Sequence, residues 1–286
     1  MKPIDSTKLA ILYDYTFCVE SDSTGKKLKD FYRLQIGNNV NRYYSEYSQR
    51  VDSIAFNYIL SLEQKYIDQL TPDWTPSRLQ RTLYSWIPEG VCPLYNDVYT
   101  FNTVAERKVS SRFQYVEYQY TEPLDVLDWE MLPGNENILG FECNRAKVTF
   151  RGRTWVVCFT FDIPYPAGPW KLGGLPGLIL KAEDTQGLFK WEACGITQGE
   201  NDPIFEFVDG YSTDKRIYVW IPNNKTKKST RKEVEKMWKR FWNAPRTIQF
   251  FNEGEGWFVD SEDREQVVRI SDPVPNNYYP RLELDI

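Results

Sequence analysis

The segment Phe141–Asp162, FECNRAKVTFRGRTWVVCFTFD, decides the fold class that we expect for this chain. One side of its second half is formed by large apolar residues at every other position, namely Trp155, Val157, Phe159 and Phe161. This two-residue period is that of a β-strand with one buried face. Gly152 suits a tight turn, because glycine accepts positive φ angles. We therefore expect an antiparallel hairpin in which Phe150 faces Arg153.

Patterns of the same kind continue on both sides of this hairpin. We expect further strands near residues 8–19, 31–36, 113–120, 178–183, 189–196, 204–207 and 217–220. Apolar residues at three- and four-residue steps predict an amphipathic helix over residues 48–69. A second helix is expected to begin at Thr230, because Thr230 and Glu233 have the spacing of a capping box. No repeat or long linker is present, so we expect one domain covering residues 1–286.

The composition excludes several classes of function. The 286 residues include no histidine, which removes Ser-His-Asp and Cys-His catalysis and the common zinc sites. The five cysteines form no CxxC pair, so we expect neither a bound metal nor a cofactor. A net charge of -5 argues against nucleic-acid binding. No stretch approaches the roughly 18 apolar residues of a membrane span, so we expect no transmembrane segment.

The hairpin register also bears on two of the cysteines. If Arg151 and Gly152 form the turn, Arg145 faces Cys158 and Cys143 is only a diagonal neighbour of Cys158. Diagonal pairs are about 7–8 Å apart, which exceeds the reach of a disulfide. We therefore predict that Cys143 and Cys158 are not bonded to each other.

The most distinctive segment is Gly168–Leu180, GPWKLGGLPGLIL. Within it, Leu175-Pro176-Gly177-Leu178 suits a type II turn, with Pro176 presetting φ and Gly177 accepting a positive φ. The glycines do not indicate a phosphate-binding loop, because no Lys-Ser/Thr follows and a strand comes next.

On these residues the sequence resembles the GLPGLI family of Bacteroidota, whose name is the run Gly174–Ile179. The resemblance extends to Cys143–Ala146, Trp155, Ile163-Pro164 and Gly168-Pro169. It implies an exported protein that is periplasmic, associated with the outer membrane, or secreted. Such proteins are also similar, more weakly, to a bowl-shaped N-terminal domain of one type of bacterial peptide-N-glycanase. The implied fold is a mainly β, curved antiparallel sheet (a bowl or half-barrel) with a concave face, on which the two helices pack.

The resemblance carries over no catalytic residue. We interpret the motif residues as architecture: Gly174, Leu175, Pro176, Gly177, Leu178 and Ile179. Four nearby residues are candidates for lining a ligand surface, namely Arg153, Trp155, Trp170 and Lys171, although packing and ion pairing are the ordinary roles of such residues.

Three functions remain open at this stage. The leading hypothesis is a non-catalytic envelope protein that binds a peptide, glycan or partner protein on a concave aromatic face. The first alternative is a carboxylate-dependent hydrolase, for which Asp128 and Glu130 would share a face if they lie in a strand. The second is a structural or assembly component of the envelope.

Overall fold

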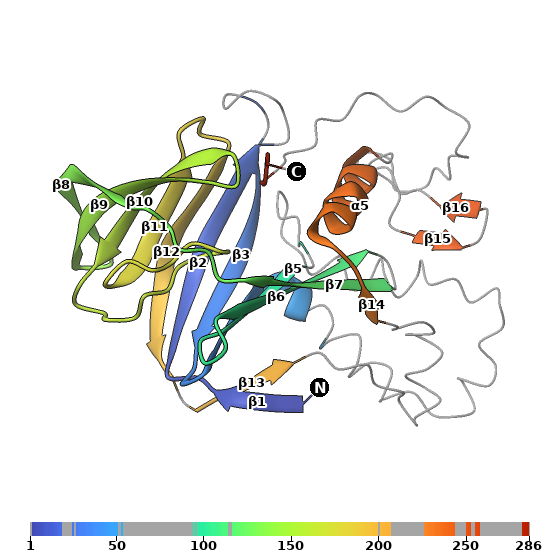
Figure 1. Ribbon diagram of the computed structural model, residues 1–286, viewed down its shortest axis with the longest axis horizontal. Coiled ribbons are helices and arrows are strands. Elements are labelled where there is room, and N and C mark those ends of the chain that lie inside the picture. Colours follow the sequence, from blue (N-terminus) through green and yellow to red (C-terminus); the bar gives the residue numbers. More distant parts are fainter. Residues whose placement is uncertain are drawn as a thin grey trace.

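The computed structural model describes residues 2–18, 25, 27–50, 53, 94, 96–113, 116–199, 201–206, 226–243, 250–252, 255–257 and 282–285. These residues form one large sheet of twelve strands. In spatial order the strands are β14 (Thr226–Lys228), β7 (Val116–Pro123), β6 (Glu106–Phe113), β5 (Asn96–Phe101), β4 (Val40–Ser45), β3 (Lys27–Ile36), β2 (Leu9–Cys18), β12 (Phe189–Gln198), β11 (Leu178–Asp184), β10 (Arg153–Thr160), β9 (Phe141–Phe150) and β8 (Glu130–Ile138). The expected mainly β fold with a curved antiparallel sheet is confirmed (Figure 1).

Two meanders build this sheet. Strands β2 to β7 follow one another outward from the middle, and β8 to β12 return from the opposite edge. The two meanders join where β12 pairs with β2, with Trp191 opposite Tyr15 and Phe189 opposite Phe17. The sheet is open, with β14 and β8 at its edges, and β14 adds to β7 in parallel. Two further pairs are β1 (Lys2–Ser6) with β13 (Pro203–Glu206), and β15 (Phe250–Asn252) with β16 (Glu255–Trp257).

The hairpin of β9 and β10 has the predicted register. Phe150 pairs with Arg153 and Arg145 with Cys158. Cys143 and Cys158 are both free thiols. Phe161 departs from the prediction: β10 ends at Thr160, and Phe161 is 53% exposed in the turn that follows.

The described helix α5 (Arg231–Asn243) begins where the sequence predicts (Figure 1). Its capping box is formed: Glu233 accepts hydrogen bonds from the N–H and hydroxyl of Thr230, and the N–H of Glu233 donates back to the Thr230 hydroxyl at 3.2 Å. Val234 is buried from this helix into the core. Of the helix expected over residues 48–69, residues 48–50 and 53 are helical, and the helical run already begins at residue 46. The others lie outside the described residues, as does the strand expected near 217–220.

The connection from β10 to β11 carries the distinctive motif, and its turn differs from the prediction. Gly177 does not have a positive φ; Gly174 does, at 83°. What requires glycine at position 177 is close backbone contact, since a Cβ there would lie 2.0 Å from the carbonyl oxygen of Thr160. Beyond it, Leu178, Ile179 and Leu180 are fully buried in β11. The motif therefore lies where the connection folds back onto the sheet, with the N–H of Ile179 donating to the carbonyl oxygen of Ala167 at 2.9 Å.

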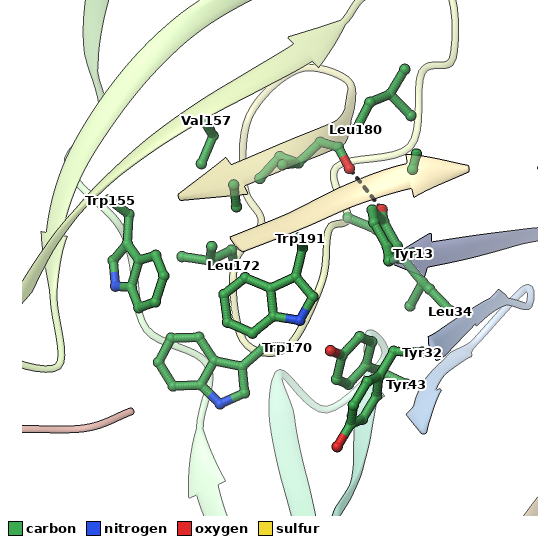
Figure 2. Close-up of a cluster of buried hydrophobic side chains, with 14 of the residues drawn as sticks. Tyr13, Tyr32, Leu34, Tyr43, Trp155, Val157, Trp170, Leu172, Leu180 and Trp191 are labelled. Carbon is green, nitrogen blue, oxygen red and sulfur yellow. Dashed lines mark hydrogen bonds between the residues drawn. The ribbon is translucent and has the colours of Figure 1, made fainter. Parts of the chain in front are cut away.

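The core lies on the concave face of the sheet. Alternate residues of neighbouring strands project into it, and large rings occupy its centre (Figure 2). Tyr15 stacks on Trp191 with ring centroids 4.8 Å apart, and Tyr32 stacks on Tyr43 at 4.5 Å. The hydroxyl of Tyr13 donates to the carbonyl oxygen of Ile179 at 2.7 Å, which ties the motif to the middle of the sheet. Among the described helices, none is both long and apolar enough to cross a membrane.

Candidate functional site

A cavity of about 80 Å³ lies on the concave face, with α5 along one side. Its described lining includes nine aromatic residues, which come from five strands, the β10–β11 connection and α5: Tyr15, Phe17, Tyr32, Tyr43, Tyr120, Trp170, Phe189, Trp191 and Trp238. The remaining described lining is Leu94, Asn96, Val109, Ser111, Lys171, Arg231, Val234, Glu235, Leu282 and Glu283. The described lining therefore combines a large group of aromatic rings with a polar group of residues at one part of the cavity.

Trp170 reaches the cavity from the β10–β11 connection in an unusual backbone conformation. Its φ is 54°, a left-handed value that is rare for a bulky residue. Its ring lies parallel to that of Trp191, with centroids 6.3 Å apart, and beside that of Trp155 (Figure 2). The packing of these three indoles holds Trp170 in place and so fixes the position of Lys171, the next residue.

Lys171 is a buried cation, with 1% of its side chain exposed. Its ammonium group contacts Glu122 at 2.8 Å, Glu283 at 2.6 Å and the hydroxyl of Tyr120 at 2.9 Å. Its carbonyl oxygen accepts a hydrogen bond from Arg107 at 3.1 Å. Through these contacts, Lys171 joins the β10–β11 segment to β6, to β7 and to Glu283.

These contacts belong to a larger ionic network. Among the described residues, its cations are Arg107, Arg151, Lys171 and Arg231, and its acids are Glu122, Asp125, Glu283 and Asp285. Burial raises the pKa of Glu122, but Lys171 and the nearby arginines outweigh this and hold that pKa below its ordinary value. A carboxylate held ionised in this way is not a proton donor near neutral pH, so the network does not favour acid catalysis.

The indole N–H of Trp191 is buried at the cavity without a hydrogen-bond acceptor among the described residues. The Tyr43 hydroxyl lies near it, but outside hydrogen-bonding geometry. An unpaired buried donor costs about 1–3 kcal/mol. Because the nitrogen is fully buried, the packing around Trp191 bears this cost.

The four sequence candidates divide into two pairs. Trp170 and Lys171 line the cavity, as described above. Arg153 lies outside its described lining and forms a buried ion pair with Asp184 at 2.9 Å. Trp155 is fully buried, and its indole N–H donates to the carbonyl oxygen of Phe150 at 3.3 Å. Arg153 and Trp155 thus have structural contacts.

The carboxylate pair considered for a hydrolase is not on a shared strand face. Asp128 precedes β8, and both Asp128 and Glu130 are exposed. Glu130 pairs with Lys147 at the surface, at 3.0 Å. In the part of the chain that the structure describes, no group of three or more Cys, Asp or Glu side chains is arranged to hold a metal ion.

Asp30 is a second buried acid of the concave interior. It is 0% exposed and accepts hydrogen bonds from the N–H groups of Phe31 and Leu94 and from the hydroxyl of Ser45. No described lysine or arginine forms an ion pair with it. Burial raises the pKa of Asp30 to about 7, although these hydrogen bonds act to lower it.

Sequence reasoning missed most of the polar cavity residues. The inward position of Glu122 could have been predicted, because it lies on the same face of β7 as Tyr118 and Tyr120. No local pattern indicates Arg231 or Glu283, because their contact depends on how the fold brings α5 and residues 282–285 together.

A scan against protein-family models finds no match, and a search of curated proteins finds none. Among solved structures, the chain is similar to PNGF-II in the C2 and P21 space groups, with a TM-score of 0.45 and 14% sequence identity in both cases. The similarity covers 85% and 92% of this chain, and the chain spans 34% and 38% of the length of those chains. A similarity this low supports no conclusion about function.

Proposed function

We propose that the protein is a non-catalytic binding protein that holds a peptide, glycan or partner-protein segment on its concave aromatic face. The observation that carries this proposal is the cavity with its nine aromatic lining residues. Flat rings stack on sugar rings and on peptide side chains.

The size of the cavity limits how much of a ligand it can enclose. At about 80 Å³ it is smaller than the 300–1,000 Å³ that encloses a drug-sized ligand. One ring or one side chain would enter it, and the rest of the ligand would remain outside.

We further propose that the protein is an exported envelope protein of the GLPGLI family. This proposal rests on the motif Gly174–Ile179. Fractionation of native cells tests the export, and recovery in the cytoplasm would contradict it.

Titration calorimetry with a panel of oligosaccharides and short peptides tests the binding function. Trp238 is a half-buried residue of α5 that lines the cavity, so Trp238→Ala should weaken binding of any ligand found by at least about tenfold, within the range of aromatic anchors. Phe161→Ala is the matched control, because Phe161 is exposed and lies outside the described cavity lining. The proposal fails if no member of the panel binds, or if the two variants bind equally well.

A further inference from the structure

Residues 282–285 lie against the turn between β9 and β10. The N–H of Leu284 donates to the carbonyl oxygen of Arg151 at 2.8 Å, as one strand does to another. Gly152 makes room for this approach, since a Cβ on it would lie 2.7 Å from the Cβ of Leu284. Arg151 and Gly152 both have positive φ, which is the backbone of a tight hairpin turn. The turn therefore offers an extended peptide backbone a hydrogen-bond acceptor at Arg151 and space beside Gly152.

Two carboxylates of this segment enter one group of cations, Lys171, Arg231 and Arg151, which we call the cationic cradle. Glu283 contacts Lys171 at 2.6 Å and Arg231 at 2.9 Å. Asp285 contacts Arg231 at 2.9 Å and Arg151 at 3.6 Å. Glu283 and Asp285 are two residues apart, so an extended backbone directs both to the same side.

The charges of the cradle require an acidic occupant. Without Glu283 and Asp285, the described acids that pair with the cradle and with Arg107 are Glu122 and Asp125, so two positive charges are left in excess. Lys171 is 1% exposed, and a buried cation without partners is costly. Burial lowers the pKa of Arg231, but Asp285 and Glu283 outweigh this and raise it above its ordinary value, in agreement with charge complementarity.

The Asp285 end of the segment lies near the surface, whereas the side chain of Glu283 is only 9% exposed. The side chains of Arg231 and Asp285 are 25% and 37% exposed, so water and salt reach their ion pair. Leu284 is 41% exposed and contributes little apolar burial. The cradle also borders the cavity, since Lys171 and Arg231 belong to both.

We propose that the cationic cradle is a binding site for an extended acidic peptide with two carboxylates two residues apart, and that residues 282–285 occupy it as an internal competitor. This inference rests on the proposed binding function and assigns its ligand class. The backbone hydrogen bond to Arg151 and the two-residue spacing favour a peptide over an acidic glycan.

Fluorescence anisotropy with a labelled PRLELD peptide, the sequence of residues 280–285, tests the proposal. The full-length variant Glu283→Gln/Asp285→Asn weakens the internal competitor, so it should bind this peptide at least about tenfold more tightly than the unmodified protein. The amide peptide PRLQLN should not bind, and salt should weaken the binding of PRLELD. The control variant Asp128→Asn/Glu130→Gln removes two exposed acids elsewhere and should bind like the unmodified protein.

A second measurement needs no variant and remains valid if the double variant is unstable. Saturating PRLELD should speed hydrogen exchange at the Leu284 N–H of the unmodified protein, because displacement breaks its bond to Arg151. Absence of PRLELD binding, equal affinity of variant and unmodified protein, or unchanged exchange at Leu284 would each overturn the proposal. Stronger displacement by oligogalacturonate than by PRLELD would overturn the assignment to peptides. If these tests fail while Trp238→Ala still weakens ligand binding, the proposed function stands and only the cradle inference falls.

Discussion

Asp30 and Glu122 are both acids of the concave interior, but the fold accommodates them differently. Asp30 is surrounded by neutral hydrogen-bond donors, and burial raises its pKa to about 7. Burial also acts to raise the pKa of Glu122, but Lys171 and two arginines keep that pKa below its ordinary value. Three neutral donors thus do not replace the hydration of a carboxylate, whereas neighbouring cations do.

Removing Lys171 should have the largest effect on stability of the changes considered. Glu122 would then have fewer cations beside it, and its surroundings would become more like those of Asp30. Lys171→Met removes the cation that contacts Glu122 at 2.8 Å and Glu283 at 2.6 Å, and leaves both carboxylates buried. We expect the free energy of unfolding to fall by about 3–5 kcal/mol, as for other broken buried pairs. Urea unfolding at neutral pH measures this. A loss below about 1 kcal/mol would show that the remaining arginines compensate and that Lys171 is not required.

Asp30 should make stability fall as pH rises. The folded state holds the Asp30 proton more tightly than the unfolded state, whose pKa is near 3.8, so this contribution is fully present below about pH 4 and is lost as pH rises to about 7. The slope is at most about 1.4 kcal/mol per pH unit. Asp30→Asn should remove it, in urea unfolding at a series of pH values. Asp14→Asn, on a partly exposed acid of the adjacent strand, is the control and should keep the slope.

Glu122 should act in the opposite direction and at lower pH. Its folded pKa lies below the unfolded value, so its stabilisation is present above about pH 4.3 and is lost as pH falls through the folded pKa. Glu122→Gln should therefore reduce the loss of stability that occurs as the pH falls below about 4.3. An unchanged acid limb in the unfolding free energy would refute the assignment of the lowered pKa to Glu122.

We expect the smallest change in stability at an ion pair on the surface, which serves as a reference for the buried ion pairs. Lys147 contacts Glu130 at 3.0 Å, with side chains 40% and 66% exposed. Lys147→Met should change the free energy of unfolding by less than about 1 kcal/mol, as is usual for exposed ion pairs. A larger loss would mean that the cost of Lys171→Met cannot be attributed to burial of its partners.

Local patterns predicted local structure well. The turn at Arg151 and Gly152 fixed the hairpin register, because side-chain alternation and turn geometry act over few residues. The capping box at Thr230 and Glu233 placed the start of α5 for the same reason. The explanation of Gly177 failed because its cause is the backbone of Thr160, which comes close only after the connection folds back.

The candidate site was only partly predictable. Trp170 and Lys171 were found through the motif, whereas Arg231 and Glu283 meet across long sequence distances that no local pattern encodes. The inward position of Asp30 could have been predicted from the sequence, because alternation places it on the same face of β3 as Tyr32, Leu34 and Ile36. An acid at such a position indicates either a partner or a shifted pKa.

The junction of the two meanders has a consequence for how the protein folds. Except from β4 to β5 and from β10 to β11, neighbouring strands within each meander are joined by eight residues or fewer. The pairing of β2 with β12 instead joins Phe17 to Phe189 and closes most of the chain. Long-range closure is entropically costly and slow, so we expect the hairpins to form first and the central seam late. Pulse-labelling hydrogen exchange would show this as delayed protection of the Trp191 amide relative to amides of β9 and β10. Until that seam closes, the aromatic rings of the cavity have no common interior, and a partly folded chain would present them to other chains as an aggregation surface.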